Sequence, residues 1–438
     1  MLSSPGLPPF DLLVLGGEVV DPAAGRHGRY DIGVADGRIA AVVPSSPALR
    51  YDPAREVVDA RRCLVLPGLV DLHAHIFDGA TYWGIDPRAL AWRTGVTTWV
   101  DAGSAGAYNA SSLGRFCSGL APLRSKAFLN ISAIGLVADT GEARRDALCD
   151  AGLCAAVLER YSDFFIGVKC RMDRNAVGEM GLEPLRRAVR AASSAGVPVM
   201  AHIAAGPPAI DDVLDLLRPG DILTHCATGQ SMSLVGPDGN LRPSAVRARE
   251  RGVLFDVGHG SGSFSFAVAE SMLRSGFPPD VISSDAHQRS VLGPGFDLPT
   301  CMSKFLALGM RVEDVVRAVT SAPARAFGYA AEAGSLEVGR RADLAVFEFA
   351  EGDFALFDTD LEVRSCTRLL VNRATYAGGA LLPAGPPFVP APWVEVTSQQ
   401  RDILSGRAGD LRRPWAAVLG RPECFVGLGV TGSPPGLG

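Results

Sequence analysis

The residues of this chain that are best suited to chemistry are histidines, one lysine and one aspartate, each placed where a short apolar segment ends. The chain of 438 residues contains only seven histidines. Five of them occupy such positions: His73, His75, His202, His225 and His259. The first two are two residues apart, so both side chains point to the same face of a strand and can chelate one metal ion. The pattern therefore predicts a metal site.

Lys169 and Asp285 are candidates to supply oxygen ligands beside the nitrogen ligands of the histidines. Lys169 ends the apolar segment 164–168, where an unpaired ammonium group is costly to bury. Either it pairs with a nearby carboxylate or reaches solvent, or it has reacted with CO2 to form a carbamate whose two oxygens bridge two metal ions. The neighbouring imidazoles favour the carbamate. Asp285 ends another apolar segment, where its carboxylate can bind metal and accept a proton.

Three further polar residues are candidates for contact with a substrate. Arg171 shares the strand face of Lys169, and its planar guanidinium can bind a carboxylate through two hydrogen bonds, although a salt bridge at the rim would use it equally well. His259, in a Gly- and Ser-rich loop, either donates to the substrate or is bonded to backbone. Asn130 follows another predicted strand.

Five other residues near these strand ends have simpler interpretations. Tyr82 and Trp83 follow the first strand and either line the pocket or pack beside it. His287 lies just past the last strand end and is interpreted as support for a ligand. Cys170 and Cys226 each neighbour a candidate ligand, so strand alternation turns them to the opposite face and predicts that both pack in the core.

The candidate ligands require a fold that brings many strand ends together. From Pro67 to about Gly328, short apolar strands alternate with segments of helical period, which is typical of repeated βα units. Helices are predicted over 183–195, 209–217 and 312–327. Strand ends are identified near residues 73–75, 100–101, 130–132, 168–169, 201–202, 224–225, 256–257 and 284–285. Eight strands predict a closed (β/α)8 barrel of about 250 residues, with its active site at the carboxyl ends of the strands.

Strand-like segments flank the barrel. Those between 11 and 66 are separated by turn signals at Gly16-Gly17, Asp21-Pro22 and Ala35-Asp36-Gly37. Similar patterns return at 334–339, 342–347 and 367–372. The predicted fold class is α/β: a (β/α)8 TIM-like barrel at 67–330 with a small discontinuous β-sandwich domain formed by 11–66 and 334–383. A Pro- and Gly-rich extension follows at 384–438, for which a docking arm, a dimer contact and a flexible end are all open.

Composition and net charge limit the classes of protein to which this chain could belong. Hydrophobic residues make up 47% and charged residues 20%, which is ordinary for a packed enzyme. The net charge of −5 argues against a nucleic-acid partner. Nine cysteines without a CxxC pair indicate reduced thiols. The sequence shows neither the basic start of a secretory signal nor an apolar run of about 18 residues, so we expect a cytoplasmic protein without a membrane partner. The expected partner is a small-molecule substrate, and a homo-oligomer stays open.

The order of the candidate ligands along the chain resembles that of a known enzyme family. Two histidines on strand 1, lysine on strand 4, histidine on strands 5 and 6 and aspartate on strand 8 match the ligand order of binuclear amidohydrolases, among them dihydroorotases, hydantoinases and deacylases. The chain resembles this superfamily over nearly its whole length, including Val65-Leu-Pro-Gly-Leu-Val-Asp-Leu-His-Ala-His and Gly334-Ser-Leu-Glu-Val-Gly-Arg-Arg-Ala-Asp-Leu-Ala-Val-Phe. It is most similar to the amidohydrolase/deacetylase group, to which acetyl-hydroxyacid esterase activity is attached, through Phe128-Leu-Asn-Ile-Ser and Asp256-Val-Gly-His-Gly-Ser-Gly-Ser-Phe-Ser-Phe.

The resemblance implies a division of labour among these residues. Two divalent ions are expected, Zn²⁺ first, with Mn²⁺, Fe²⁺ and Co²⁺ as alternatives. Asp285 accepts the proton of a hydroxide that bridges the ions and passes it to the leaving group. The metal ligands are implied as follows: His73, His75 and Asp285 for the more buried ion, His202 and His225 for the more exposed one, and carbamylated Lys169 between them.

The expected function is removal of a small, acetyl-like acyl group from an N-acyl or O-acyl substrate that bears a carboxylate. A cyclic-amide hydrolase of the dihydroorotase or hydantoinase kind is the alternative, because the same metals serve both reactions. A nucleobase deaminase is less favoured, since Ala205 stands where such enzymes place a glutamate three residues after the strand-5 histidine. A non-catalytic scaffold of the same fold is the non-enzyme alternative, and the complete ligand set argues against it.

Overall fold

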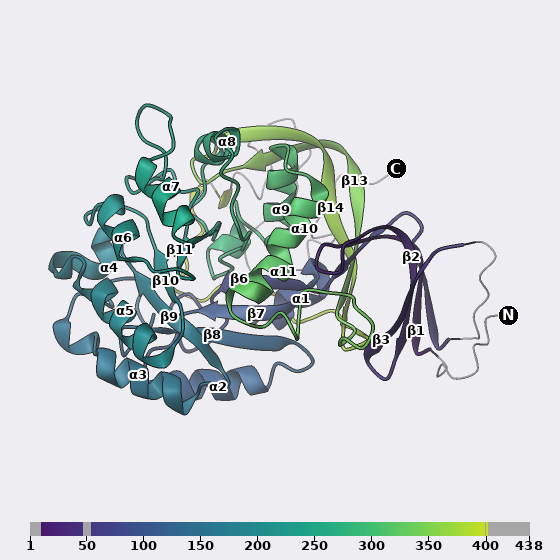
Figure 1. The fold of residues 1–438 in the computed structure, drawn as a ribbon, viewed down its shortest axis with the longest axis horizontal. Coiled ribbons are helices and arrows are strands. Elements are labelled where there is room, and N and C mark those ends of the chain that lie inside the picture. Colours follow the sequence, from purple (N-terminus) through teal and green to yellow (C-terminus); the bar gives the residue numbers. More distant parts are fainter. Residues whose placement is uncertain (1–9, 47–53, 399, 402–438) are drawn as a thin grey trace.

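The computed structural model describes residues 10–46, 54–398 and 400–401. Two sheets organise this part of the chain, a curled sheet surrounded by helices and a second sheet of eight strands (Figure 1). The curled sheet has seven strands: β6 (Leu69–Ala74), β7 (Val96–Ala102), β8 (Arg124–Asn130), β9 (Phe165–Arg171), β10 (Val199–His202), β11 (Ile222–Thr224) and β12 (Leu254–Asp256). Neighbours in this sheet follow chain order and are all parallel, because each connection returns to the same end of the sheet.

The eighth predicted strand is present as a pair of bridges. Val281 forms a parallel bridge with Asp256 beside β12, and Ala286 forms one with Ala74 of β6. Segment 281–286 therefore joins the two edges of the curled sheet, as the last strand of a barrel does. The mixed α/β fold is consistent with the predicted barrel, and the carboxyl ends of all these segments meet on one side.

Helices cover the outside of the curled sheet (Figure 1). They are α1 (Arg88–Thr94), α2 (Ala110–Ser118), α3 (Ala151–Arg160), α4 (Arg174–Val177), α5 (Glu183–Ala195), α6 (Ile210–Leu216), α7 (Pro243–Glu250), α8 (Phe266–Arg274), α9 (Leu298–Ala307), α10 (Val312–Val319) and α11 (Ser321–Ala326), with 3-10 turns at Asp146–Leu148, Gly178–Met180 and Ser290–Leu292. The prediction of one helix over 312–327 was wrong. Two helices meet at Thr320 (φ −131°, ψ −86°), and Pro323 sits in the first turn of the second, where its missing N–H costs nothing.

The second sheet joins distant parts of the chain. Its strands are β1 (Leu12–Asp21), β2 (Arg26–Ala35), β3 (Arg38–Pro44), β4 (Glu56–Asp59), β5 (Leu64–Pro67), β13 (Leu344–Phe357), β14 (Val363–Ala377) and β15 (Ala380–Leu381). Antiparallel pairing of β13 with β5 links the C-terminal hairpin to the N-terminal strands in one continuous sheet. The C-terminal β segment thus completes the N-terminal sheet as predicted, whereas a separate sandwich is not confirmed and the domain boundaries stay a prediction.

Two local expectations for this sheet were wrong. Gly16-Gly17 is not a turn: β1 runs through it, and the pairing with β2 shifts between Val14 and Gly17 as in a β-bulge, which a glycine at φ +69° allows. Segment 334–339 contains no strand among the described residues. The turn at Asp36-Gly37 does form, with both residues at positive φ, which matches the twist of the flanking strands.

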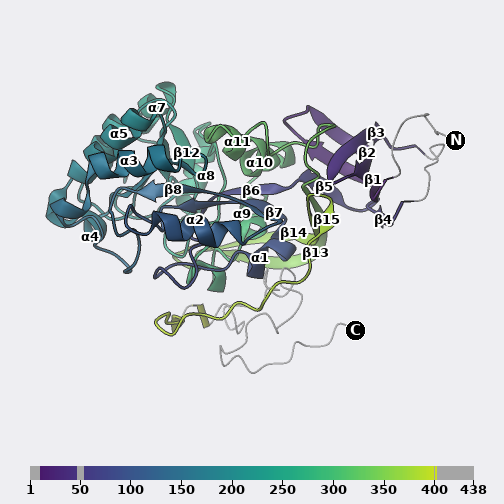
Figure 2. The ribbon, with the colours of Figure 1, turned by 90° about the horizontal axis from the view of Figure 1, so that it is seen from below.

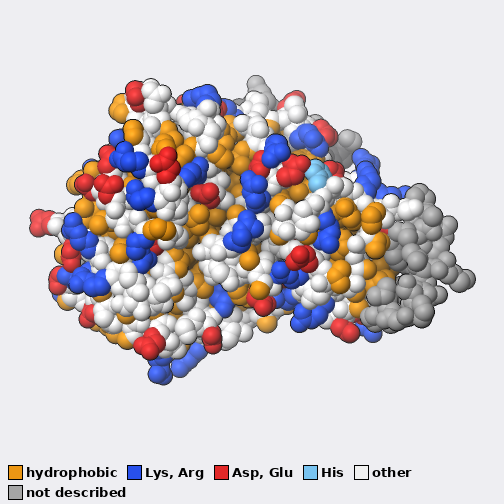
Figure 3. All heavy atoms as spheres, in the orientation of Figure 1, with side chains coloured by type: hydrophobic (Ala, Val, Ile, Leu, Met, Phe, Trp, Pro, Cys, Tyr) orange, Lys and Arg blue, Asp and Glu red, His pale blue; other side chains and the backbone are white. Residues whose placement is uncertain are grey.

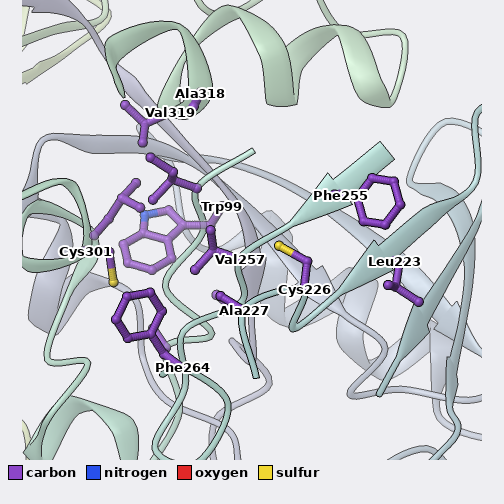
Figure 4. Packing of buried hydrophobic residues seen from close by; sticks show 14 of the residues in the cluster. Trp99, Leu223, Cys226, Ala227, Phe255, Val257, Phe264, Cys301, Ala318 and Val319 are labelled. Carbon is purple, nitrogen blue, oxygen red and sulfur yellow. The ribbon is translucent and has the colours of Figure 1, made fainter. Parts of the chain in front are cut away.

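Three hydrophobic clusters hold the fold together. The largest lies between the curled sheet and its helices and contains Trp99, Cys226 and Phe264 (Figure 4). Cys170 belongs to it as well, so both cysteines next to candidate ligands are packing residues, as predicted. A third cluster gathers residues of neighbouring strands on the inner face of the curled sheet: Leu72, Val100, Ala102, Phe128, Met200, Ile222 and Val281.

The surface has mixed charge. On the face shown in Figure 3, Lys and Arg side chains are interspersed with Asp and Glu and with apolar atoms. None of the helices in the described ranges has the length and apolar composition that crossing a membrane requires.

Candidate metal centre

The carboxyl ends of the curled sheet bring the six predicted ligands together. His73 and His75 come from the end of β6, Lys169 from β9, His202 from the end of β10 and His225 from just after β11. Asp285 comes from the bridged segment 281–286. One ligand atom each of His73, His225 and Asp285 lies within 4.8 Å of the other two. Residues from five separate segments therefore surround one point.

The Asp285 carboxylate is the clearest indication that these residues could bind a cation. Its Oδ1 lies 3.3 Å from His73 Nε2 and 3.2 Å from His75 Nε2. This oxygen is buried and has no hydrogen-bond partner in the described chain, which is rare and costly for a carboxylate. A divalent cation bound by these nitrogen and oxygen atoms would satisfy it, so the donor set fits a metal.

A second group of nitrogen donors lies beside the first. His225 Nε2 is 2.7 Å from His202 Nδ1, and the two rings are nearly perpendicular. The other nitrogen of His225 donates to the Gly258 carbonyl at 2.6 Å. This bond places the ring proton on Nδ1, so the Nε2 lone pair faces His202 and is available to a cation.

Hydrogen bonds behind the β6 histidines fix their orientation. The Thr224 hydroxyl donates to Asp256 Oδ2 at 2.7 Å and therefore accepts from His73 Nδ1 at 2.8 Å. His75 Nδ1 lies 2.9 Å from Ser104 Oγ. Each ring consequently presents Nε2 to Asp285. Such outer hydrogen bonds orient metal-binding imidazoles and raise their basicity.

Burial keeps the imidazoles neutral. It lowers the pKa of His75 to about 3 and of His225 to about 4, and it lowers the pKa values of His73 and His202 well below the ordinary value. Neutral imidazole has a free lone pair, which is the form that binds metal.

Lys169 is a buried amine that forms no ion pair with the described carboxylates. Its side chain is 1% exposed, and its Nζ lies 3.1 Å from His73 Nε2 and 3.3 Å from Met200 Sδ. None of the ion pairs formed by described residues includes it. Burial lowers the pKa of Lys169 to about 7, because the cation loses its hydration. Much of this amine is therefore uncharged at neutral pH.

The backbone at the site is under constraint. His225 (φ +69°) and Asp285 (φ +48°) both have left-handed backbones, which non-glycine residues rarely adopt and which cluster at functional sites. Two glycines of the loop after β12 leave room for the side chains of His73 and Asp285. A Cβ on Gly258 would lie 2.9 Å from His73 Nδ1, and one on Gly260 would lie 2.5 Å from Asp285 Oδ2.

The three predicted substrate contacts are already engaged by protein groups. Arg171 donates to both oxygens of Glu142, each at 2.6 Å. The Asn130 amide donates to Gly103 O and accepts from Ser132 N. His259 is fully buried, 2.7 Å from the Nζ of Lys304, and its ring stacks on Phe264. The alternatives that the sequence left open are both present: Arg171 forms a salt bridge with Glu142, and His259 Nδ1 lies 2.9 Å from the Gly260 carbonyl oxygen. Contact of these three residues with a substrate stays a prediction.

Sequence reasoning gave no role to Thr224, Ser104, Asp101 or Asp256. Asp101 accepts from the backbone N–H groups of Ile76 and Ser104, and so supports the residue that contacts His75. A signal was present, since Asp101 and Asp256 end strands as Asp285 does. The partner of each could not be identified from sequence because it lies on another strand.

Comparisons with known proteins agree with this geometry. Residues 64–372 match the model of the amidohydrolase family. The chain is 38% identical over 352 residues to the deacetylase Atu3266 of Agrobacterium fabrum, covering 80% of this chain and 85% of that protein. Two solved structures, titled as an adenine deaminase and a dihydroorotase, have TM-scores of 0.78 and 0.77 and identities of 31% and 35%; each match covers 85% of this chain and 99% of the other.

The family model spans well over half of the chain and includes all six candidate ligands. The resemblance inferred from the ligand order is confirmed at this level, and so is an enzyme that hydrolyses C–N bonds. The chain belongs to the amidohydrolase family, in its deacetylase-like branch.

Proposed function

We propose that this protein is a metal-dependent deacylase that removes a small, acetyl-like group from an N-acyl or O-acyl substrate bearing a carboxylate. The observation that carries the proposal is the buried Asp285 Oδ1, which has no hydrogen-bond donor among the described residues and faces the Nε2 atoms of His73 and His75. The deacetylase relatives support the acyl group as the part that is removed.

The ligands divide into two groups that share Lys169. His73, His75 and Asp285 would hold one divalent ion, and His202 with His225 would hold the other. Zn²⁺ suits these nitrogen and oxygen donors, and Mn²⁺, Fe²⁺ or Co²⁺ could replace it. When bound, such ions polarise an acyl carbonyl and lower the pKa of water to about 7.

A carbamate on Lys169 would supply the oxygens between the two groups. The neutral amine uses its lone pair to attack CO2, a C–N bond forms, and one proton is released to solvent. The product is an anion, which suits a position next to bound cations. The burial of Lys169, its lowered pKa and the absence of an ion pair with any carboxylate of the described chain all favour this reaction over a permanent ammonium.

Asp285 would move the proton. It takes a proton from the attacking water and delivers it to the nitrogen or oxygen of the leaving group. His287 lies near this carboxylate: its Nδ1 accepts from the N–H groups of Arg289 and Ser290, so its proton is on Nε2, which lies 3.8 Å from Asp285 Oδ2, beyond hydrogen-bond distance.

The test combines metal analysis with substrate hydrolysis. We expect about two ions per chain and hydrolysis of N-acetyl or O-acetyl carboxylic acids by the metal-loaded protein. Lys169→Ala should lower both the metal content and the activity, whereas Lys126→Ala, a lysine that bonds to the Asp163 carbonyl outside the site, should change neither. With ¹³C-labelled bicarbonate, a carbamate signal should appear in wild type and be absent in Lys169→Ala. A protein that binds no metal after reconstitution would refute the proposal and leave a non-catalytic scaffold.

A cyclic-amide hydrolase is the second candidate. The dihydroorotase structure, with 35% identity, supports it, and the same metal ligands can serve ring opening. Dihydroorotate and hydantoins belong in the same substrate panel. Turnover of these rings, without hydrolysis of acetylated acids, would replace the deacylase by this candidate.

A further inference from the structure

Arg289 is a cation at the rim of the candidate metal centre that forms no ion pair with any described carboxylate. It is half-buried, and its Nη2 donates to Tyr82 Oη at 2.8 Å. Its Cζ lies 5.6 Å and 5.2 Å from the ring centroids of Tyr82 and Trp83. Its Nε is buried and has no hydrogen-bond partner within the described ranges, and no ion pair there involves it. A guanidinium in this setting offers N–H groups that fit a carboxylate.

Arg289 is close to the groups that would carry out the chemistry. Its backbone N–H donates to His287 Nδ1 at 3.1 Å, and the other nitrogen of that ring lies 3.8 Å from Asp285 Oδ2. The Trp83 ring bridges the two, with its centroid 4.8 Å from that of His287. Two rings in succession, Trp83 and His287, therefore connect the guanidinium to Asp285, which puts Arg289 at the rim of the candidate metal centre.

Arg171, the other arginine at this end of the sheet, is a poorer candidate. Its charge is matched by Glu142 through two hydrogen bonds, and the side chains are 10% and 3% exposed. A substrate carboxylate binding to Arg171 would place a second anion beside a buried Glu142. Arg289 carries no such partner, so a substrate anion would supply its missing counter-charge.

The chain after β15 holds this rim in place. We call residues 383–401, apart from 399, the strap; Figure 2 shows the chain after β15 running along one side of the molecule. Trp393 Nε1 donates to Tyr82 O at 3.1 Å, and Ala391 N donates to Gln288 Oε1 at 3.0 Å. Gln400 Nε2 donates to the Arg289 carbonyl at 2.9 Å and to the Gly293 carbonyl at 3.0 Å. The strap thus ties the loop after β6 to the loop after Asp285, and it lies outside the residues matched by the family model.

We propose that Arg289 binds the carboxylate of the substrate, and that the strap positions Arg289 and Tyr82 for this contact. The inference rests on the proposed deacylase function and names the residue that selects an acid over its neutral analogue. It also assigns a role to the described part of the C-terminal extension.

The experiment compares two substrates that differ only in the anion. Racemic N-acetylalanine and N-acetylalaninamide share the acyl group, and only the former carries a carboxylate. Wild type should prefer the acid. Arg289→Gln should lower kcat/KM for the acid by roughly 10- to 150-fold, the size of a lost hydrogen bond to a charged group, and should change kcat/KM for the amide less than about threefold with metal content unchanged. The matched control is Arg190→Gln, which removes an exposed arginine far from these residues in the chain, and it should retain the preference.

Calorimetry separates failure of this inference from failure of the proposed function. If the metal-loaded wild type hydrolyses neither these two compounds nor the O-acetyl acids of the panel, the deacylase proposal fails. Binding of N-acetylalanine to wild type and Arg289→Gln still tests Arg289. Weaker binding to the variant supports the assignment. Equal binding, an equal loss of activity on acid and amide, or a wild type without preference for the acid would each overturn it.

Discussion

Removal of the Thr224 hydroxyl would test how the metal ligands are oriented. Thr224→Val preserves the shape of the side chain but deletes the group that accepts from His73 Nδ1 at 2.8 Å and donates to Asp256 Oδ2 at 2.7 Å. All three residues are buried. Thr97 provides a matched control, because it is also a buried strand threonine and its hydroxyl has no hydrogen-bond partner in the described part of the chain.

The magnitude follows from the groups left without partners. A buried polar group that loses its hydrogen bond costs about 1–3 kcal/mol. The substitution leaves two such groups, His73 Nδ1 and Asp256 Oδ2, without the Thr224 hydroxyl. His73 Nδ1 is already 3.5 Å from Asp256 Oδ2, so a small shift would recover part of the loss. We therefore expect the free energy of unfolding of the metal-free protein to fall by about 2–3 kcal/mol in Thr224→Val, and by less than about 0.5 kcal/mol in Thr97→Val.

Metal affinity gives the second readout. Loss of an outer hydrogen bond to a metal-binding histidine lowers metal affinity about 10- to 100-fold. Competition with a chromophoric chelator measures this affinity, and urea denaturation measures the free energy of unfolding. A Thr224→Val protein with both values equal to those of Thr97→Val would refute the inference that this hydroxyl orients His73.

Three shorter predictions concern catalysis, pH and the strap. Asp285→Asn should lower turnover at least about a hundredfold while metal analysis still finds bound ions, because the amide cannot accept the proton; substantial residual turnover would contradict this role. Hydrogen bonds to Glu18 and Glu313 raise the pKa of His27 above its ordinary 6.5, so the stabilisation they provide is complete below pH 6.5 and is lost as pH rises through the raised pKa. The unfolding free energy of wild type should fall relative to His27→Gln between about pH 5.5 and 8.5, and parallel pH profiles would exclude the effect. Gln400→Leu removes two hydrogen bonds to loop carbonyls and should reduce kcat/KM for N-acetylalanine about 3- to 10-fold with little change for the amide, which steady-state kinetics would detect.

Local features of the sequence determined the candidate ligands. Each βα unit is a short stretch of chain, so the end of an apolar strand is visible without knowledge of its neighbours. His73 and His75 share a face because of their spacing alone, and the packing of Cys170 and Cys226 in the core follows from the same alternation. Helix 183–195 was predicted with its observed bounds, since its apolar period is regular and a glycine follows its end.

Tertiary structure decided what surrounds those ligands. The partner of Arg171 is Glu142 from a different loop, and Thr224 reaches His73 across 151 residues of chain. The contacts of Arg289 and the strap became visible only because the structure brings two loops and the C-terminal segment together. Nothing in the residue types at 289 and 400 predicts that contact. Backbone periodicity acts over a few residues, whereas hydrogen-bond partners and counter-charges are set by which segments the fold brings together. The sequence therefore identified the candidate metal ligands, and the structure identified the groups that contact them.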